Sequence, residues 1–397
     1  MNENDKTTGL ILTGGGARAA YQVGVLKAVS VILREAGWPA EKNPFAIICG
    51  TSAGAINATA LACSADNFGV GVRNLLQVWT HMNAAQIYRA DSIGMLRSGA
   101  RWLSILSFGW MLRQWHRDPP MSLLDNSPLA ELLDSMLDYS GLDASLASGA
   151  LQALAVTASS YTTGQHLTFY QTLNPVEPWV RSQRRSQQDY ITTQHLLASS
   201  AIPFIFPSVS VNWGGRMEYC GDGAMRQLAP ISPAIHLGAK KILIVGAGRM
   251  SEQKPEAPLL AQYPSIAQIA GHAMSSIFLD SLAVDIERLN RINKTISILP
   301  QELQDKMALH AIDTLIISPS QRLDAIASKH IKSLPLPVRT MLAGIGATEI
   351  RGSALASYLL FESAYTTELI ELGKLDAFDM KSQVLDFFGK SKSVSTE

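Results

Sequence analysis

Short apolar runs alternate with amphipathic segments over the first 250 residues of the chain. The apolar runs lie at residues 9–13, 45–49, 151–159, 166–170 and 241–247. Runs such as "LILT" and "ILIV" are apolar on both faces, which is typical of strands in a sheet that helices cover on both sides. Periodic segments predict helices at 17–34, 53–63, 127–138 and 192–199. This alternation indicates an α/β protein.

Helical periodicity dominates after about residue 250, as in "IAGHAMSSIFLDSLAVDIERLNRI" and "SALASYLLFESAYTTELIELG". One further strand is predicted at 313–318, in "DTLIIS". We therefore expect four regions along the chain: a flexible N-terminus (1–8), an α/β domain (9–248), a mostly helical C-terminal region (249–388) and a disordered tail (389–397).

Composition limits the binding partners and the cellular compartment that we expect. The 397 residues include 33 Lys and Arg and 33 Asp and Glu, so the zero net charge gives no reason to expect nucleic acid as a partner. The three cysteines are too few for a disulfide framework and suit a reducing compartment. The opening residues, "MNENDKTTG", lack the basic and apolar parts of a signal peptide. We therefore expect a cytoplasmic protein.

An uncharged stretch at 43–65 is nearly long enough to span a membrane. It contains Pro44, Gly50 and Gly54 together with several polar residues, and it divides into a strand-like half and a helix-like half. We therefore expect this stretch to be buried core.

Three consecutive glycines, Gly14, Gly15 and Gly16, interrupt "LTGGGARAAYQVGVLKAV" and need an explanation, because glycine is the residue most costly to order. A dinucleotide fingerprint fits Gly14-x-Gly16-x-x-Ala19, but no carboxylate ends the second predicted strand to hold a ribose. A phosphate loop does not fit, since no Gly-Lys-Ser or Gly-Lys-Thr follows. An oxyanion hole and a tight strand–helix turn without chemical importance remain.

The second predicted strand supplies a nucleophile for an oxyanion hole. In "FAIICGTSAGAINATALAC", the run Gly50-Thr51-Ser52-Ala53-Gly54 stands between an apolar strand and a helix of small residues. The pattern G-x-S-x-G is weak alone, but in a strand–turn–helix setting it predicts a nucleophile elbow. The Ser52 hydroxyl would then stand at a helix N-terminus, which favours developing negative charge.

Acyl transfer at Ser52 requires backbone N–H groups that face the carbonyl oxygen as it becomes negative. The three glycines open a helix after the first strand, and their lack of side chains lets a substrate carbonyl approach their amides. Arg18, in the first turn of that helix, can steady the loop or add positive potential. Ala53, which follows the nucleophile, offers a further N–H.

A serine nucleophile also needs a base. Three of the four late histidines lie in or beside helical patterns, which favours structural roles, and His330 is the least excluded; the four are His236, His272, His310 and His330. The other candidate is Asp222 in "MEYCGDGAMRQLAP", where flanking glycines let the carboxylate approach another backbone closely. An ordinary Asp-Gly turn would give the same local sequence.

The chain resembles the patatin-like phospholipase family in five ordered blocks over residues 9–248: "GGGARAAYQVGVLKAV", "GTSAGAINA", "SLLDNSPLAELL", "ASSAIPFIFPSV" and "GDGAMRQLAPISPAIHLGAKKILIV". The resemblance implies a three-layer α/β/α fold with a mainly parallel sheet, and a lipid acyl hydrolase that uses a Ser–Asp dyad without histidine. It implies Ser52 as the nucleophile and Asp222 as the base, with Arg18 and the three glycines in the oxyanion element. The C-terminal region resembles the helical extension of some bacterial members.

Two residues depart from the pattern of the family. Ala19 stands where the family motif usually has glycine, and its methyl group fits a helix but can shift the loop slightly. Ala224 stands in place of glycine as the third residue of the dyad motif, which is a common and harmless variant. The resemblance implies no metal and no cofactor, and a phospholipid or another acyl lipid as substrate. The alternatives are a transacylase or thioesterase with the same dyad, and a non-catalytic protein that binds phosphate or lipid through its glycine loop.

The segment 98–124, "SGARWLSILSFGWMLRQWHRDPPMSLL", combines Trp102, Trp110 and Trp115 with aliphatic residues, and Arg and His residues flank them. Tryptophan and arginine beside an apolar face suit a mobile lid or peripheral contact with the inner face of a membrane. An amphipathic helix packed on the core would show the same pattern.

Overall fold

The computed structural model describes residues 7–89, 122–248, 263–304, 306–307, 309–348 and 352–390. The segment predicted as a lid or membrane contact, 98–124, lies outside the described residues except for 122–124. Residues 1–6 of the predicted flexible N-terminus and 391–397 of the predicted tail also lie outside them.

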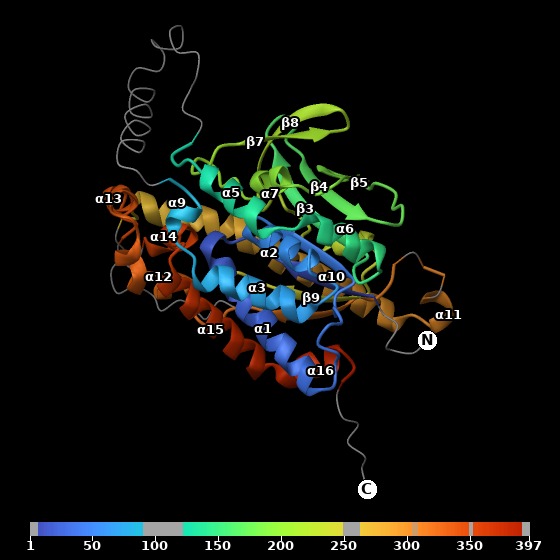
Figure 1. Cartoon of the computed structure of the whole chain (residues 1–397). Coiled ribbons are helices and arrows are strands. Elements are labelled where there is room, and N and C mark those ends of the chain that lie inside the picture. Colours follow the sequence, from blue (N-terminus) through green and yellow to red (C-terminus); the bar gives the residue numbers. More distant parts are fainter. Residues whose placement is uncertain are drawn as a thin grey trace.

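A mixed sheet of ten strands runs through the described part of the chain (Figure 1). Five strands are neighbours and parallel, in the order β10-β9-β1-β2-β3. The strands that continue from β3 form antiparallel pairs, except that β4 and β6 are parallel. The strands are β1 (Thr8–Leu12), β2 (Ile47–Thr51), β3 (Ala153–Ser160), β4 (His166–Thr172), β5 (Val180–Arg181), β6 (Arg184–Gln188), β7 (Val209–Trp213), β8 (Arg216–Asp222), β9 (Lys241–Val245) and β10 (Asp313–Ile317). All six predicted strands are present. The sequence did not predict β5–β8, which are short or carry polar residues on an exposed face.

Helices follow most of the strands and confirm the predicted periodic segments. Before residue 249 they are η2 (Gly16–Ala19), α1 (Ala20–Glu35), α2 (Ala53–Ala62), α3 (Phe68–Thr80), η3 (Ala84–Gln86), α5 (Ser127–Met136), α6 (Tyr139–Ala147), α7 (Thr193–Ser199) and α8 (Ser232–His236). In the C-terminal part they are α9 (Ile266–Ser275), the π-helical turn η4 (Ser276–Asp280), α10 (Ser281–Ile298), α11 (Gln301–Gln304), α12 (Leu323–His330), η5 (Ile331–Ser333), α13 (Leu336–Gly344), α14 (Ser353–Leu359), α15 (Ser363–Asp379) and α16 (Lys381–Phe387).

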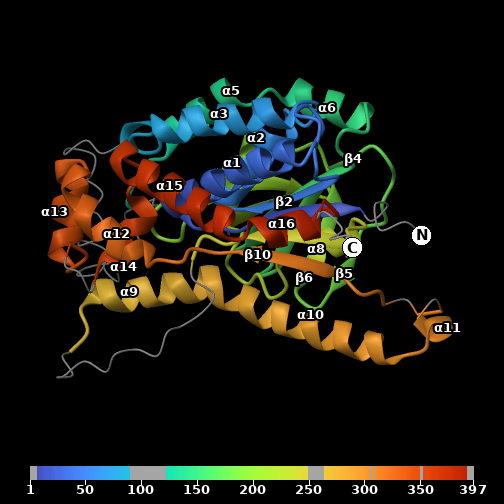
Figure 2. The same ribbon diagram turned by 90° about the horizontal axis from the view of Figure 1, so that it is seen from below.

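The strand pleat divides the core into two layers of side chains. Leu10 and Leu12 of β1 belong to the larger cluster, under α1, α2 and α3, whereas Ile11 belongs to the cluster that α8 and α10 cover. Successive strand residues point to opposite faces, so apolar runs without alternation fit a sheet buried on both sides. Figure 2 shows α10 on one face of the sheet and α1, α2 and α3 on the other. The predicted three-layer architecture is confirmed.

The C-terminal part shares this core. Strand β10 extends the sheet beside β9, and α15 packs along α1. The two helices approach so closely that a Cβ on Gly24 would overlap the carbonyl of Ile370, and one on Gly373 would overlap the carbonyl of Tyr21. Glycine is therefore required at this crossing for steric reasons. The predicted boundaries of the regions stay predictions.

Two apolar stretches have lengths close to that of a membrane span. The uncharged stretch 43–65 forms the buried strand β2 and helix α2, as predicted. Among the described residues, the helical run Ile266–Ile298 is long and apolar enough to cross a membrane, by length and composition only. Its second half, α10, carries Asp, Glu, Arg and Lys residues and packs Leu282, Ile286 and Leu289 against the sheet. Helix α10 is therefore one of the helices that cover the sheet.

Candidate functional site

Ser52 occupies a sharp turn between β2 and α2. Its φ of 56° and ψ of −131° are strained for a residue with a side chain, and its N–H donates to Ser199 Oγ at 2.8 Å. The turn requires small neighbours, because a Cβ on Gly50 would lie 2.5 Å from Ala55 Cα and one on Gly54 would overlap the β1 backbone. The sequence G-x-S-x-G thus folds here into the strained elbow that it predicts.

Asp222 meets Ser52 at the end of β8. The Ser52 hydroxyl donates to Asp222 Oδ2 at 2.6 Å, and the Ala224 N–H donates to Oδ1 at 2.9 Å. Both Ser52 and Asp222 are buried. Burial raises the pKa of Asp222 to about 7, although the hydrogen bonds from Ser52 and Ala224 lower it. A carboxylate with a pKa near neutrality can take a proton from a hydroxyl group and return it.

Ser199 and His166 hold the backbone around this pair. The carbonyl of Ser199 accepts from the Gly223 N–H at 2.9 Å, so Ser199 contacts the backbone beside both Ser52 and Asp222. His166 Nε2 lies 3.0 Å from the Gly223 carbonyl, which can only accept, so this nitrogen carries the proton. Burial lowers the pKa of His166 to about 4, which keeps the ring neutral. Neither residue has a role predicted from the sequence, although Ser199 lies in the block "ASSAIPFIFPSV".

The glycine loop lies directly against Ser52. A Cβ on Gly14 would lie 3.1 Å from Ser52 Cβ, and Gly16 has a φ of 55° and faces the carbonyl of Tyr358. Among the described residues, none accepts a hydrogen bond from the N–H of Gly14 or of Gly15. Unpaired N–H groups beside a nucleophile are suited to bind an oxyanion. Ala53 begins α2 on the other side of Ser52.

Arg18 is buried, and its guanidinium faces the C-terminal helix α14. Nε donates to Ser357 Oγ at 2.8 Å, Nη1 to the Tyr358 hydroxyl at 3.1 Å and Nη2 to the Ala354 carbonyl at 3.2 Å. The guanidinium also lies 3.9 Å from the centre of the Tyr358 ring. These contacts join the turn after the glycines to α14. No sequence signal pointed to α14 as its partner.

A network of buried, hydrogen-bonded polar side chains supports the glycine loop. Gln22 Nε2 donates to the carbonyl of Thr13 at 2.8 Å, and Asn57 Nδ2 donates to Gln22 Oε1 at 3.0 Å. Trp79 Nε1 in turn donates to Asn57 Oδ1 at 2.8 Å. The network joins α1, α2 and α3 to the residue before the glycines, which fixes the loop relative to Ser52.

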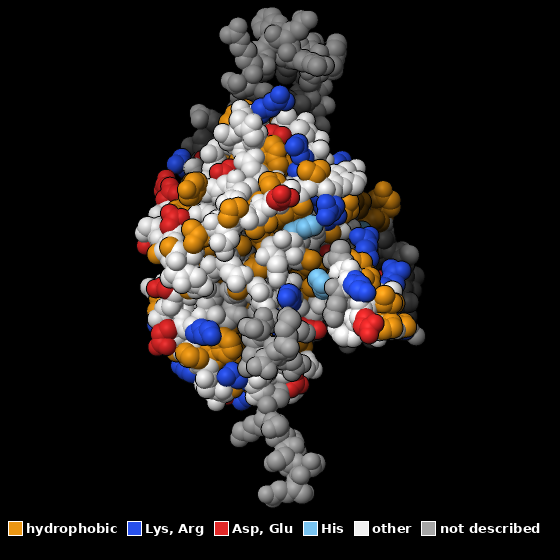
Figure 3. All heavy atoms as spheres, turned by 90° about the vertical axis from the view of Figure 1, so that its right-hand side faces the viewer, with side chains coloured by type: hydrophobic (Ala, Val, Ile, Leu, Met, Phe, Trp, Pro, Cys, Tyr) orange, Lys and Arg blue, Asp and Glu red, His pale blue; other side chains and the backbone are white. Residues whose placement is uncertain are grey.

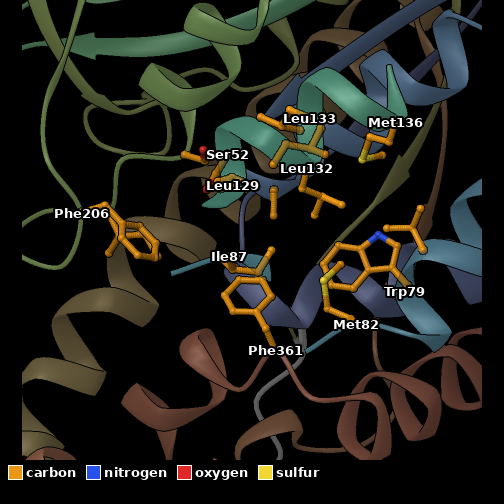
Figure 4. A pocket seen from close by; sticks show the side chains of 16 residues that line it. Ser52, Trp79, Met82, Ile87, Leu129, Leu132, Leu133, Met136, Phe206 and Phe361 are labelled. Carbon is orange, nitrogen blue, oxygen red and sulfur yellow. The ribbon is translucent and has the colours of Figure 1, made fainter. Parts of the chain in front are cut away.

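An apolar pocket leads away from Ser52, with about 540 Å³ of empty space that includes space open to solvent (Figure 4). Helix α5, from the block "SLLDNSPLAELL", supplies several side chains of its wall. The larger side chains that line it are Ile56, Val78, Trp79, Met82, Ile87, Leu129, Leu132, Leu133, Met136, Ile202, Phe206 and Phe361. Figure 4 shows Ser52 near one end of the pocket and Met136 and Trp79 near the other. No lining residue carries a formal charge, so the pocket fits a hydrocarbon chain.

The late histidines have contacts of their own. His236 stacks on Trp179 with ring centres 4.7 Å apart, and His330 Nε2 lies 2.6 Å from Glu368 Oε2. His272 and His310 are exposed. The partner of the Ser52 hydroxyl is the Asp222 carboxylate. Within the part of the chain that the structure describes, no group of three or more His, Cys, Asp and Glu residues could hold a metal ion.

Comparison with known proteins gives one family match. A family model described as patatin-like phospholipase matches residues 10–235. Among solved structures, the chain is similar to VipD from Legionella pneumophila, with 14% identity and a TM-score of 0.28 over 92% of this chain and 67% of that chain. It is also similar to the type III effector protein ExoU, with 14% identity and a TM-score of 0.24 over 99% of this chain and 90% of that chain. A comparison with curated proteins finds no match.

Proposed function

Because the chain belongs to the patatin-like phospholipase family, we propose that it is a serine lipid acyl hydrolase, of the phospholipase A or lysophospholipase type, that uses Ser52 and Asp222. The observation that carries this proposal is the 2.6 Å hydrogen bond from the Ser52 hydroxyl to the Asp222 carboxylate, beside an apolar pocket. Hydrolysis of a lipid ester needs both a nucleophile and a place for the acyl chain, and this arrangement offers both.

In the first half of the reaction, the Asp222 carboxylate takes the hydroxyl proton of Ser52 while Oγ attacks the ester carbonyl carbon. Negative charge develops on the carbonyl oxygen, which the N–H groups of Gly14, Gly15 and Ala53 are proposed to face. The tetrahedral intermediate collapses as its bond to the leaving oxygen breaks, and Asp222 returns the proton to that oxygen. The alcohol product leaves, and the acyl group stays on Ser52.

In the second half, a water molecule gives a proton to Asp222 and attacks the acyl carbon. Collapse of this intermediate breaks the bond to Ser52 Oγ, which takes the proton back, and the fatty acid leaves. An alcohol in place of water would give acyl transfer by the same steps. The competition between water and an added alcohol therefore separates hydrolase from transacylase activity.

An active-site-directed fluorophosphonate tests the proposal, together with hydrolysis of a soluble short-chain ester. We expect the wild-type protein to be labelled and to hydrolyse the ester, and the Ser52→Ala protein to do neither while keeping its unfolding midpoint. The matched control is Ser64→Ala, a change of the same type in the turn after α2. Ester hydrolysis by a folded Ser52→Ala protein would contradict the proposed nucleophile.

A further inference from the structure

Two aromatic residues from the C-terminal part of the chain pack against the glycine loop. Phe278 lies in the π-helical turn η4 and Tyr358 lies near the end of α14, and both are buried. Their rings stack with the centres 5.0 Å apart and the planes 27° apart. Figures 1 and 2 both place α9, which leads into η4, beside α14. The stack therefore joins two helical segments of the C-terminal part.

The two aromatic residues approach different glycines of the loop. A Cβ on Gly14 would lie 2.8 Å from Phe278 Cδ1 and 3.1 Å from Ser52 Cβ. The Phe278 ring and Ser52 therefore approach the same side of Gly14. The carbonyl of Tyr358 faces Gly16, where a Cβ would overlap it. The C-terminal part thus limits the path of the loop backbone at two points.

Tyr358 is tied to the loop by Arg18, which follows the glycines in η2. The Arg18 guanidinium lies 3.9 Å from the centre of the Tyr358 ring, and Nη1 donates to the hydroxyl at 3.1 Å. The contact that Phe278 makes is of another kind, because a phenyl ring has no polar atom to form such a hydrogen bond. Truncating Phe278 therefore removes a packing contact with Gly14 and leaves the hydrogen bonds around the loop in place.

Gly14 has no side chain that could fix its position, and glycine loses more conformational freedom on ordering than any other residue. We propose that Phe278 is a positioning residue, whose ring holds Gly14 against Ser52 so that the N–H groups of the glycine loop face the oxyanion as it forms. The turn that carries Phe278 is π-helical, and π-turns inside α-helices are frequent at functional sites. The inference rests on the proposed function, because the oxyanion forms in the proposed reaction.

Hydrolysis of a soluble short-chain ester by full-length Phe278→Ala protein tests this role. We expect kcat to fall about 10–100-fold and KM to stay within about twofold, because a loosened loop loses a contact that is made only in the transition state. The Phe278→Leu protein keeps an apolar side chain of smaller size, so its kcat should fall only about 3–10-fold.

A trifluoromethyl ketone inhibitor adds a readout that depends on the oxyanion itself. Ser52 Oγ adds to the ketone carbon, the hydroxyl proton passes to Asp222, and the negative charge stays on the ketone oxygen. The affinity of the Phe278→Ala protein for this inhibitor should therefore fall by the same factor as its kcat/KM, about 10–100-fold. A role of Phe278 in stability alone would lower the unfolding midpoint and leave the inhibitor affinity of the folded protein unchanged.

The matched control is Met274→Ala. Met274 is buried on α9, four residues before Phe278, and it is not among the atoms nearest to a Cβ on any of the three glycines. Its truncation should lower the unfolding midpoint and keep kcat within about twofold. A surface control is Val180→Ala, since Val180 is 63% exposed on β5, on the face where Figure 3 shows hydrophobic side chains among charged ones. This variant should match the wild type in kcat, KM and unfolding midpoint.

An unchanged kcat in folded Phe278→Ala protein would overturn the inference, and so would an equal loss of kcat in the Met274→Ala control. A rise in KM with unchanged kcat would overturn it as well. If Phe278→Ala does not fold, the Phe278→Leu protein decides by the same criteria. A wild type without esterase activity would overturn the proposed function and this inference with it, whereas an active wild type with equally active Phe278 variants overturns the inference alone.

Discussion

Replacing Asp222 with asparagine separates the proposed chemistry from the stability of the fold. The amide has nearly the same shape as the carboxylate, and its oxygen can accept the Ala224 N–H that Oδ1 accepts at 2.9 Å. Its NH₂ group can donate to Ser52 Oγ, which lies 2.6 Å from Oδ2. The Asp222→Asn protein therefore keeps both contacts but has no base. We expect ester hydrolysis to fall by about 10²–10⁴-fold, the usual contribution of a positioned base.

The same substitution should stabilise the protein at neutral and alkaline pH. Burial raises the pKa of Asp222 from 3.8 to about 7, so the folded protein holds the proton more tightly than the unfolded chain does. Below pH 3.8 both states are protonated and the wild type has its full stability. As the pH rises from there to about 7, the free energy of unfolding falls by about 1.4 kcal/mol per pH unit. The complete loss is about 4 kcal/mol, and the Asp222→Asn protein does not experience it.

Urea unfolding of the two proteins at about pH 5 and about pH 8 measures this difference. The stability advantage of the Asp222→Asn protein should be about 2–3 kcal/mol larger at the higher pH. Effects of the substitution that do not depend on pH cancel in this comparison. In the wild type, kcat/KM should rise with pH with an apparent pKa near 7, since the ionised carboxylate is the proposed base. A stability difference that does not change with pH would refute the assignment of a buried, raised pKa to Asp222.

Two further substitutions test the pocket and the loop. Met136→Trp, at the end of the pocket distant from Ser52, should lower kcat/KM for a long-chain ester about tenfold or more relative to a short-chain ester. Equal losses on both esters would indicate that the acyl chain does not reach Met136. Arg18→Met removes three hydrogen bonds to α14 and should lower the free energy of unfolding by about 2–4 kcal/mol in urea titrations. Arg18→Lys is its control for charge, and an unchanged stability in Arg18→Met would show that these bonds do not hold the loop.

The sequence by itself determined the features that depend on residues near one another in the chain. Apolar runs predicted six of the strands because a sheet covered on both faces buries most of their side chains. The elbow at Ser52 was predictable because Gly50 and Gly54, which the turn requires, are its close neighbours in sequence. The resemblance to the patatin-like family identified Asp222 as the partner of Ser52. Periodicity and spacing alone left Asp222 and the late histidines as alternative bases.

Only the tertiary structure decided which distant residues meet. Asp222 is 170 positions from Ser52, and it reaches Ser52 because β8 pairs with β3. The partners of Arg18 on α14 are more than 330 positions away, and the C-terminal Phe278 lies against Gly14. Local sequence patterns indicate whether a residue is buried and how the backbone turns. They do not indicate which part of the protein covers that residue. The surface that packs on each residue depends on shape complementarity between segments far apart in the chain. The raised pKa of Asp222 depends on it too, because it follows from burial.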